Sequence, residues 1–431
     1  MALPISGNQT AQSSGQSNDK TKIVLVLVFA VFFILGGVTN INDVLIPKFK
    51  SLFQLSHFQA NLVQFAFFTS YAIFSIPAGR LLSKIGYVRG FVAGFIIIAL
   101  ASLLFLPAAY SGQYIWFLVA LFVLGGGITL LQVAMNPVTL SLGKPDTAHS
   151  RLTFAQLFNS IGVFLMIYGG SELLLGESST VDPTTLSPDA LAAFRVAEST
   201  VIGQAYIGLA VAMVVIAMVF WFYRSALDGQ AAEDVKTEGA WTLLMSRPRL
   251  AFGALCIFCY VGAEVAIGSN LIAYLGDDRT MGLAAPEAGK LLALYWGGAL
   301  VGRLVGTVLL RVFQPGLLLL TFAGIAIGLN FVSGISSGAL AGWTLIIVGL
   351  FNSIMFPTIF SLATEGLDKE APQASGILCT AIVGGAFVPP LFGLVADAGG
   401  LAAALIVPVA CYAIIAAFGL YASRNPVASA S

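Results

Sequence analysis

Apolar residues fill most of this chain in twelve long segments separated by short polar stretches. A helix needs ~20 mostly apolar residues to cross a lipid bilayer, and each segment reaches about that length. The segments are too uniformly apolar for the alternating strands of an outer-membrane barrel, and backbone groups in lipid must be paired within helices. The pattern therefore predicts an all-α membrane protein with twelve transmembrane helices. They are at residues 23–48, 57–79, 88–108, 114–142, 151–175, 200–223, 249–275, 285–311, 315–335, 338–364, 374–397 and 400–422.

The composition excludes a soluble protein. Of the 431 residues, 58% are hydrophobic and only 9% are charged, against ~25% charged in soluble domains. Twenty basic residues balance 20 acidic ones, so no net charge attracts nucleic acid, and we expect none as a partner. The four cysteines show no zinc or disulfide spacing, and there are only two histidines. No nucleotide-binding, zinc-protease or serine-hydrolase motif occurs, so we expect neither an enzyme nor a cofactor or metal.

The distribution of lysine and arginine predicts the orientation, because these residues favour the cytoplasmic side. With the N-terminus inside, 15 of the 20 basic residues lie inside and five outside. Both termini are then cytoplasmic. Residues 1–20 are polar and are predicted to form a disordered cytoplasmic tail, and the charged segment 224–247 a cytoplasmic linker. On the outer side, Ser187, Pro188 and Asp189 have the pattern of a helix start, and we expect a short amphipathic helix there before the sixth span.

A weak internal repeat divides the chain in two. LQVAMNPVTLSLG at 131–143 matches FNSIMFPTIFSLA at 351–363 in Met, Pro, Ser and Leu at an offset of 220, and GRL at 79–81 recurs at 302–304. The offsets are nearly equal and connect corresponding spans, which favours duplication over chance recurrence of Pro and Gly in apolar helices. Two pseudo-symmetric six-helix bundles are the plan of alternating-access transporters, which bind substrate between the bundles. The predicted bundles comprise residues 21–223 and 248–431.

Two acidic residues lie inside predicted spans and away from the first and last few residues of those spans. A carboxylate inside a span costs at least ~2.5 kcal/mol on insertion scales. Asp43 lies toward the outer end of the first span, and Glu264 lies close to the middle of the seventh. A carboxyl group removed from water favours its neutral form, so either acid can take up and release a proton. Both are therefore candidates for coupling transport to protons. The alternatives are an interfacial Asp43 that pairs with Lys48, and a structural role for Glu264.

Amide side chains form a second polar set within the spans. A neutral amide both donates and accepts hydrogen bonds, which suits a neutral, hydroxyl-rich ligand. Buried amides also hold membrane helices together, and the sequence leaves both roles open for each residue. As a set they favour a polar cavity, in which Tyr295 and Trp296 either stack on a sugar or serve only in packing. The predicted substrate-binding residues are Asn40, Gln132, Asn136, Gln156, Asn159, Glu264, Asn270 and Asn352.

Several strings resemble a known family of transporters. The loop GRLLSKIGYVRG at 79–90 is similar to the motif between the second and third spans of the major facilitator superfamily, with Ser83 at its acidic position. Six further strings, spread over both halves of the chain, together resemble the fucose:proton symporter family and within it the glucose/galactose branch. They are NINDVLIPKF (40–49), LQVAMNP (131–137), SRLTFAQLFNSIG (150–162), YVGAEVAIGSNLIAYL (260–275), FPTIFSLATEGL (356–367) and GILCTAIVGGAFVPPLFGLVADAGG (376–400).

The resemblance implies a twelve-helix facilitator bundle that imports a hexose with a cation. In the fucose carriers, an Asp in the first span and a Glu in the fourth serve proton coupling and sugar contact. The Asp corresponds to Asp43, whereas Gln132 stands at the position of the Glu. Glu264 stands where a fucose carrier has Gln, so we hypothesise that it replaces the missing acid. Gln156 and Asn159 match the polar face of the family's fifth span, which implies that they are sugar ligands.

The favoured function is a secondary active importer of a neutral hexose, with glucose and galactose ahead of fucose and N-acetylglucosamine. The expected coupling ion is H⁺, with Na⁺ left open because a carboxylate with amides can bind either ion. A passive facilitator, a membrane enzyme and a drug exporter are the other classes. The buried acids oppose the first, the missing motifs the second and the neutral amides the third. We expect a monomer embedded in the lipid of a bacterial inner membrane.

Overall fold

The computed structural model describes residues 9–141, 148–175, 186–222, 224, 240–367 and 370–425, and all the secondary structure in these ranges is helical. Ten of the described helical stretches are long and apolar enough to cross a membrane. The elements are α1 (Gln9–Phe53), α2 (His57–Ile85), α3 (Tyr87–Ser111), α4 (Tyr114–Ser141), α5 (Ala148–Leu175), α6 (Pro188–Phe222), α8 (Ala240–Ser246), α9 (Pro248–Gly276), α10 (Ala285–Val312), α11 (Pro315–Ile335), α12 (Gly338–Asn352), α13 (Met355–Thr364), α14 (Ala371–Thr380), the 3₁₀ turn η3 (Ala381–Val383), α15 (Gly384–Gly399), α16 (Leu401–Ala404) and α17 (Ile406–Arg424).

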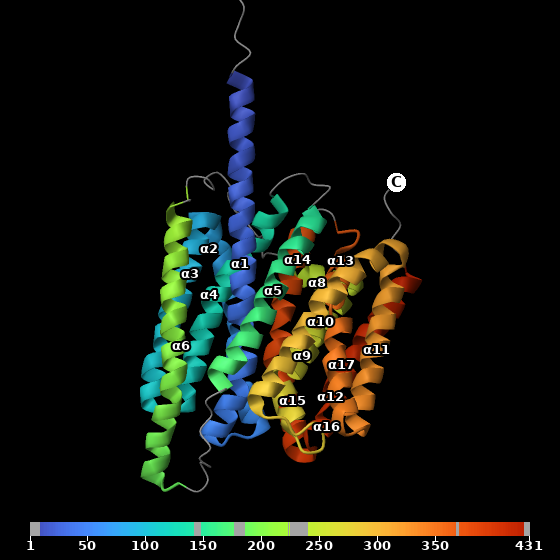
Figure 1. The fold of residues 1–431 in the computed structure, drawn as a ribbon. Helices are drawn as coiled ribbons and strands as arrows, with labels where there is room; N and C mark the ends of the chain where they lie inside the picture. The colour runs from blue at the N-terminus through green and yellow to red at the C-terminus, as the bar shows by residue number, and fades with distance from the viewer. Residues whose placement is uncertain are drawn as a thin grey trace, which may run out of the picture.

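The helices form one bundle that consists of two groups, α1 to α6 and α8 to α17 (Figure 1). We call them the N-terminal and the C-terminal group. The start of α1 and the end of α17 lie at the same end of the bundle, which we call the terminal end; the opposite one is the far end. Between the groups, α2 packs on α15, α5 on α10, and α1 on α9. These three seams are where a substrate site between the groups has to be built.

The two predicted spans that fall outside the ten apolar stretches are α2 and α5. Each is a long helix, of 29 and 28 residues, but in α5 the apolar part is limited to Phe154–Gly169. The sequence of α2 includes amides on the side that packs on other helices, Asn61 and Gln64, which are 0% and 3% exposed. Both helices lie along the seams between the groups, and a helix in that place needs less apolar surface than one surrounded by lipid.

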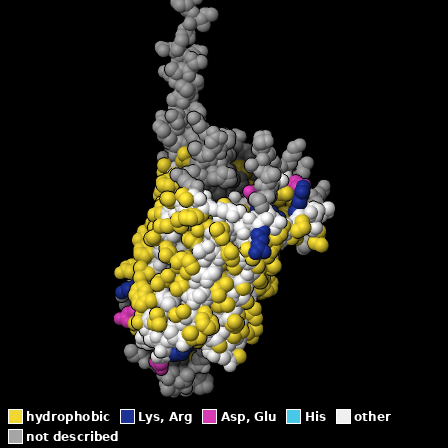
Figure 2. Space-filling model, turned by 90° about the vertical axis from the view of Figure 1, so that its right-hand side faces the viewer, with side chains coloured by type: hydrophobic (Ala, Val, Ile, Leu, Met, Phe, Trp, Pro, Cys, Tyr) yellow, Lys and Arg dark blue, Asp and Glu magenta, His cyan; other side chains and the backbone are white. Residues whose placement is uncertain are grey.

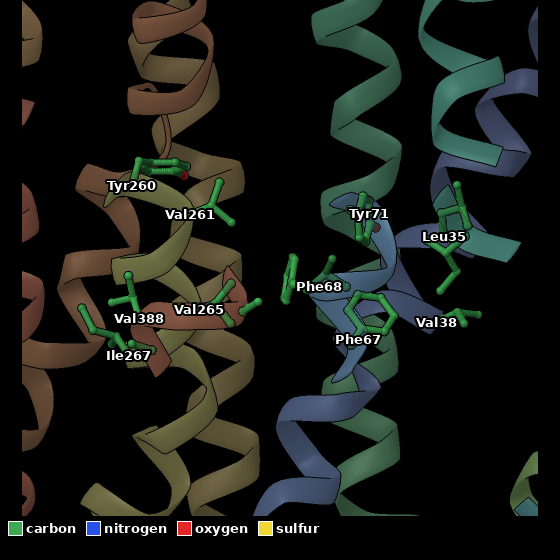
Figure 3. Packing of buried hydrophobic residues seen from close by; sticks show 14 of the residues in the cluster. Leu35, Val38, Phe67, Phe68, Tyr71, Tyr260, Val261, Val265, Ile267 and Val388 are labelled. Carbon is green, nitrogen blue, oxygen red and sulfur yellow. The ribbon is translucent and has the colours of Figure 1, made fainter. Parts of the chain in front are cut away.

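Hydrophobic side chains cover the middle of the face seen in Figure 2, and the visible charged side chains lie toward its two ends. Large exposed apolar residues occur along the outer helices, for example Phe222, Val308 and Phe331. Inside, one hydrophobic cluster extends through both groups. Figure 3 shows part of it, with Phe67, Phe68 and Tyr71 of α2 and Tyr260 and Val265 of α9. A molecule that is apolar both inside and on the outer surface midway between its ends is suited to a bilayer and not to water.

Glycine allows the closest approach between helices of the N-terminal group. A Cβ atom on Gly36 of α1 would lie 2.1 Å from the main-chain oxygen of Asn159, and one on Gly162 of α5 would lie 1.9 Å from that of Phe33. No larger residue fits at either position without moving a main chain. The α1–α5 contact therefore depends on the small residues typical of membrane helix interfaces.

Two predictions about helix starts were wrong. Residues 9–20 were expected to be disordered but continue α1 as helix, since extending a formed helix is far easier than starting one; residues 1–8 lie outside the described residues. The expected short helix on the outer side is not separate, because α6 runs unbroken from Pro188 to Phe222. Its start was predicted correctly: the Ser187 hydroxyl accepts a hydrogen bond from the N–H of Ala190 at 3.4 Å. In the predicted linker, residues 240–246 form the short helix α8.

Three of the predicted spans in the C-terminal group are broken. In the tenth, α12 ends at Asn352 and α13 begins at Met355. In the twelfth, α16 ends at Ala404 and α17 begins at Ile406. The eleventh is interrupted by η3 at residues 381–383. Pro389 and Pro390 both lie inside α15. Proline removes the hydrogen bond to the carbonyl four residues earlier, and for these two prolines that carbonyl belongs to Gly385 and Ala386, at the start of α15.

Candidate functional site

Asp43 lies on α1 near the far end of the bundle, where the two groups meet. Its side chain is 2% exposed. One carboxylate oxygen, Oδ1, accepts hydrogen bonds from Ser269 Oγ on α9 and from Gln64 Nε2 on α2, each at 2.9 Å. Gln64 Nε2 also donates to Ser269 Oγ at 2.8 Å. The acid is therefore held by both groups, and the alternative of a pair with Lys48 is not supported, because Lys48 Nζ lies 2.5 Å from Glu198.

The second carboxylate oxygen of Asp43 faces Gly268 and the indole of Trp296 on α10. A Cβ atom on Gly268 would lie 2.9 Å from Trp296 Cζ2 and 3.4 Å from Asp43 Oδ2. Glycine at this position thus lets the indole and the carboxylate approach the same turn of α9. The Trp296 Nε1 atom is buried and has no hydrogen-bond partner among the residues that the structure describes.

Beyond Asp43, further polar contacts close the far end between the groups. The side-chain amides of Asn61 on α2 and Asn270 on α9 bond to each other in both directions, at 3.0 and 3.1 Å. Asp397 near the end of α15 accepts the main-chain N–H groups of His57 at 2.7 Å and Phe58 at 3.0 Å. A carboxylate at a helix N-terminus is favourable, so α15 of one group caps α2 of the other. At this end the bundle is shut.

Glu264, the second predicted acid, lies on α9 four residues before Gly268, which is one helical turn or ~6 Å along the axis. Its Oε1 accepts a hydrogen bond from Tyr260 at 2.7 Å, and its main-chain oxygen accepts one from Tyr295 at 3.1 Å. It interacts electrostatically with Arg303 of α10, and also with Asp43. The structure therefore brings the two acids into one electrostatic environment from opposite groups.

Asn352, at the end of α12, is completely buried beside Glu264. Its Nδ2 donates to the hydroxyl of Tyr295 at 2.9 Å, and its Oδ1 accepts from Tyr412 at 2.8 Å. The Tyr260 hydroxyl also lies 3.0 Å from its main-chain oxygen. Asn352 thus holds α9, α10 and α17 to α12, which is the helix-joining role that the sequence left open.

The same kind of pair recurs in the N-terminal group. Gln132 of α4 donates to the hydroxyl of Tyr71 on α2 at 3.0 Å. Gln132 and Asn352 correspond under the 220-residue offset, and each bonds a tyrosine on the second predicted span of its group, α2 or α10. Asp43 and Glu264 correspond at an offset of 221. The hydrogen bonds thus follow the internal repeat, but Gln132 is only half-buried whereas Asn352 is sealed.

The remaining predicted ligands lie in different surroundings. Asn40 Nδ2 bonds the Gly36 oxygen of its own helix at 3.1 Å, and Asn159 Nδ2 bonds the Phe32 oxygen of α1 at 3.1 Å. Gln156 is half-buried on α5. Asn136 lies in α4, but its side chain is outside the described residues. Of the predicted set, Asn159, Asn270 and Asn352 are therefore engaged in joining helices, as is Gln132 through Tyr71.

Some residues of the site were not singled out from the sequence. Gln64 and Asn61 are i, i+3 in an apolar segment, the same signal that identified the other amides. Ser269 has no such signal, because serine is common in membrane helices. Arg303 was counted among inner basic residues, yet it is half-buried in α10 and bonds Ser160 Oγ on α5, so it too joins the groups.

Membrane helices in two groups, with buried acids and amides where the groups meet, define the class of secondary transporters. The chain matches the family model of the Major Facilitator Superfamily over residues 27–382. It is 42% identical to the glucose/galactose transporter of Brucella abortus biovar 1 (strain 9-941) over 428 residues, covering 99% of this chain and all of that one. It is 33% identical to the L-fucose-proton symporter of Escherichia coli K12 over 426 residues, 96% of each chain.

Solved structures give the same answer. The crystal structure of the fucose transporter FucP in its outward conformation aligns with a TM-score of 0.71 and 31% identity, over 94% of this chain and all of that one. A bacterial homologue of the lysosomal transporter Spinster in an inward-facing conformation shares the fold at 17% identity, with a TM-score of 0.70. The chain belongs to the major facilitator superfamily and, within it, to the family of these sugar transporters.

Proposed function

We propose that the protein is a proton-coupled symporter that imports a neutral hexose, and that it is not an enzyme. The observation that carries this is the position of Asp43, a buried acid whose carboxylate contacts both groups at once. A proton taken up there changes the interactions between the groups directly. The glucose/galactose transporter at 42% identity and the fucose symporter at 33% support both the sugar and the proton.

Glucose and galactose are the proposed sugars. The relatives at 40% identity or more are named for these two sugars, and the fucose symporter is more distant. Gln132, a neutral residue at the position where the fucose carriers have an acid, also favours a different sugar contact. Fucose and N-acetylglucosamine are the next candidates to test.

For the topology, we propose twelve spans in two six-helix bundles, 21–223 and 248–431, joined by the linker 224–247. The distribution of basic residues supports cytoplasmic termini, so that the far end faces outward. Bacterial relatives support a multi-pass protein of the inner membrane. We propose that it works as a monomer, since each chain carries both acids.

Asp43 is the proposed coupling acid, and Glu264 the second acid, which contacts sugar or assists coupling. Gln132 and Gln156 are the proposed sugar ligands with the most freedom to turn toward a hydroxyl, because both are half-buried. Asn40 and Asn136 complete the N-terminal wall in this proposal. Asn159, Asn270 and Asn352 bind sugar only if their present contacts between helices open during transport.

The cycle follows from these roles. The far end opens when the contacts of Asp43, Asn61 and Asp397 across the seam separate. Sugar and a proton then enter, and the neutral acid together with the bound sugar lets the groups close again. The terminal end opens next and releases both. Because Asp43 lies in the seam itself, a change in its charge directly alters the interactions between the two groups.

The test is uptake of labelled D-glucose into proteoliposomes with an inward proton gradient, compared with no gradient and with an inward sodium gradient. We expect uphill accumulation under the proton gradient alone. Accumulation only with sodium would replace the proton in this proposal. Equilibration without accumulation under either ion would make the protein a facilitator and would refute the coupling role of Asp43. Competition by unlabelled galactose, fucose and N-acetylglucosamine ranks the sugars.

A further inference from the structure

Three side chains from three helices form a closed set of hydrogen bonds at the far end: Asp43, Gln64 and Ser269. Gln64 Nε2 carries two hydrogens, and it lies 2.9 Å from Asp43 Oδ1 and 2.8 Å from Ser269 Oγ. Since the serine oxygen accepts one of these hydrogens, its own hydrogen points to Asp43 Oδ1, at 2.9 Å. Gln64 and Ser269 therefore each donate one hydrogen bond to the carboxylate.

An oxygen that accepts two hydrogen bonds matches an ionised carboxylate, because bonds to a charged acceptor are roughly twice as strong as bonds between neutral groups. The set also excludes water, since Asp43 is 2% exposed, Gln64 3% and Ser269 1%. A buried charge without such partners is very costly. Shutting the far end over an unprotonated Asp43 thus depends on these two donors.

We propose that Ser269 and Gln64 are positioning residues that compensate the charge of Asp43, and so allow the carrier to shut its far end with neither proton nor sugar bound. This inference rests on the proposed symport function. A symporter that accumulates sugar must return empty to the outward side after each delivery. In the loaded carrier the proton neutralises Asp43, and the two donors matter less.

The other groups that face Asp43 make this compensation necessary. Glu264 lies on α9, one turn before Gly268, and repels the Asp43 carboxylate electrostatically. From α10 comes the indole of Trp296, which lies against the same turn of α9 and also interacts with the carboxylate. On the C-terminal side, therefore, Ser269 is the residue whose hydroxyl directly contacts the carboxylate, at the position where the two groups separate.

The test compares two kinds of transport by Ser269→Ala. Net uphill uptake requires the empty carrier to return, whereas counterflow between sugar-loaded compartments at equal pH requires only the loaded carrier. Hydrogen bonds to charged groups are strong enough that we expect net uptake to fall about tenfold, with counterflow unchanged. Ser269→Thr keeps the hydroxyl and is expected to restore net uptake. The matched control is Ser102→Ala, also a buried helical serine, whose hydroxyl bonds only Ile98 of its own helix in the described structure.

A second variant, Gln64→Met, removes the other donor with little change in shape and is expected to show the same separation of net uptake from counterflow. It decides the question if Ser269→Ala fails to fold. The proposal is overturned if the variants match the parent in both assays, or if both assays fall to the same extent. Failure of the parent protein to accumulate sugar under any gradient refutes the symport function itself, and is thereby distinguished from failure of this inference.

Discussion

The two buried acids correspond under the internal repeat, yet their surroundings differ. Asp43 accepts hydrogen bonds from α2 of its own group and from α9 of the other. Glu264 accepts from Tyr260 one turn earlier on the same helix, and the network around it, with Tyr295, Asn352 and Tyr412, stays inside the C-terminal group.

This difference indicates which acid changes its contacts when the two groups move relative to each other. When the groups separate, the contacts of Asp43 must break, whereas those of Glu264 with its own group can persist. The two acids occupy corresponding helices, and only Asp43 has side-chain hydrogen bonds to both groups.

Asp43→Asn should abolish proton-driven accumulation, because the amide has almost the same shape but cannot take up a proton. Labelled glucose in proteoliposomes with an inward proton gradient is expected to stay at the level of equilibration. Counterflow in the same preparation is the control for folding and sugar binding. Uphill accumulation by this variant would show that Asp43 is not the coupling acid and would leave Glu264 as the candidate.

Glu264→Gln should have a smaller effect. It weakens one hydrogen bond and removes the charge that interacts with Arg303, and a hydrogen bond to a charged group is worth enough to lower the rate of uptake by roughly tenfold. The ratio of protons to sugar, measured by pH change in the external medium, is expected to remain that of the parent. A lost ratio would mean that both acids couple. Uptake and a ratio equal to those of the parent would leave Glu264 without a role.

Asn352→Ala and Gln132→Ala test the two equivalent amides. Removing the Asn352 side chain takes away the hydrogen-bond acceptor of the buried Tyr412 hydroxyl, at about 1–3 kcal/mol. Tyr295 loses one of its two partners and keeps the Glu264 main-chain oxygen. The thermal unfolding temperature in detergent should therefore fall clearly. Removing the half-buried Gln132 should cost less than about 1 kcal/mol in stability but weaken glucose binding. The reverse result, a stable Asn352 variant with weak binding, would place the sugar on the C-terminal side.

Asp397→Asn should have the smallest effect. The change keeps an oxygen that can cap α2 but removes the charge, which at a helix end is worth about 0.3–1 kcal/mol. A severalfold shift toward the form open at the far end is expected. Spin labels at Gln113 and Ala398, in a background without the native cysteines, measure it by their distance distribution. Asp278→Asn, an exposed acid at the same end, is the control, and an equal shift there would exclude a specific cap.

Much of the fold was accessible from the sequence because lipid imposes so strict a rule on apolar length. Helices occur at all twelve predicted segments, including α2 and α5, whose apolar character is weaker. Continuity was harder to predict. Whether α6 begins at Ser187 or near residue 200 depends on packing, and the prolines of α15 identify a disturbed helix without giving the residue at which it breaks.

For the site, the sequence identified residue types but not their neighbours. An acid such as Asp43 in an apolar helix is conspicuous, since its burial has a high cost. That its partner is Ser269, 226 residues later, depends on which faces of α1 and α9 meet, and neither helix has a strong enough pattern to show it. Asn352 shows the same limit. A buried amide in the sequence fits a sugar ligand and a link between helices equally well, and only the positions of its neighbours distinguish the two roles.

The paired amides of Asn61 and Asn270 have a consequence for the conditions outside the membrane. Both side chains are neutral, so their mutual bonds keep the same strength in dilute or salty medium and from mild acid to mild alkali. The Asp397 cap is electrostatic and is screened over a distance of ~8 Å at physiological ionic strength. A rise in external salt therefore weakens the Asp397 cap but not the bonds between Asn61 and Asn270. The far end thus keeps one of these two contacts when the ionic strength outside the membrane changes.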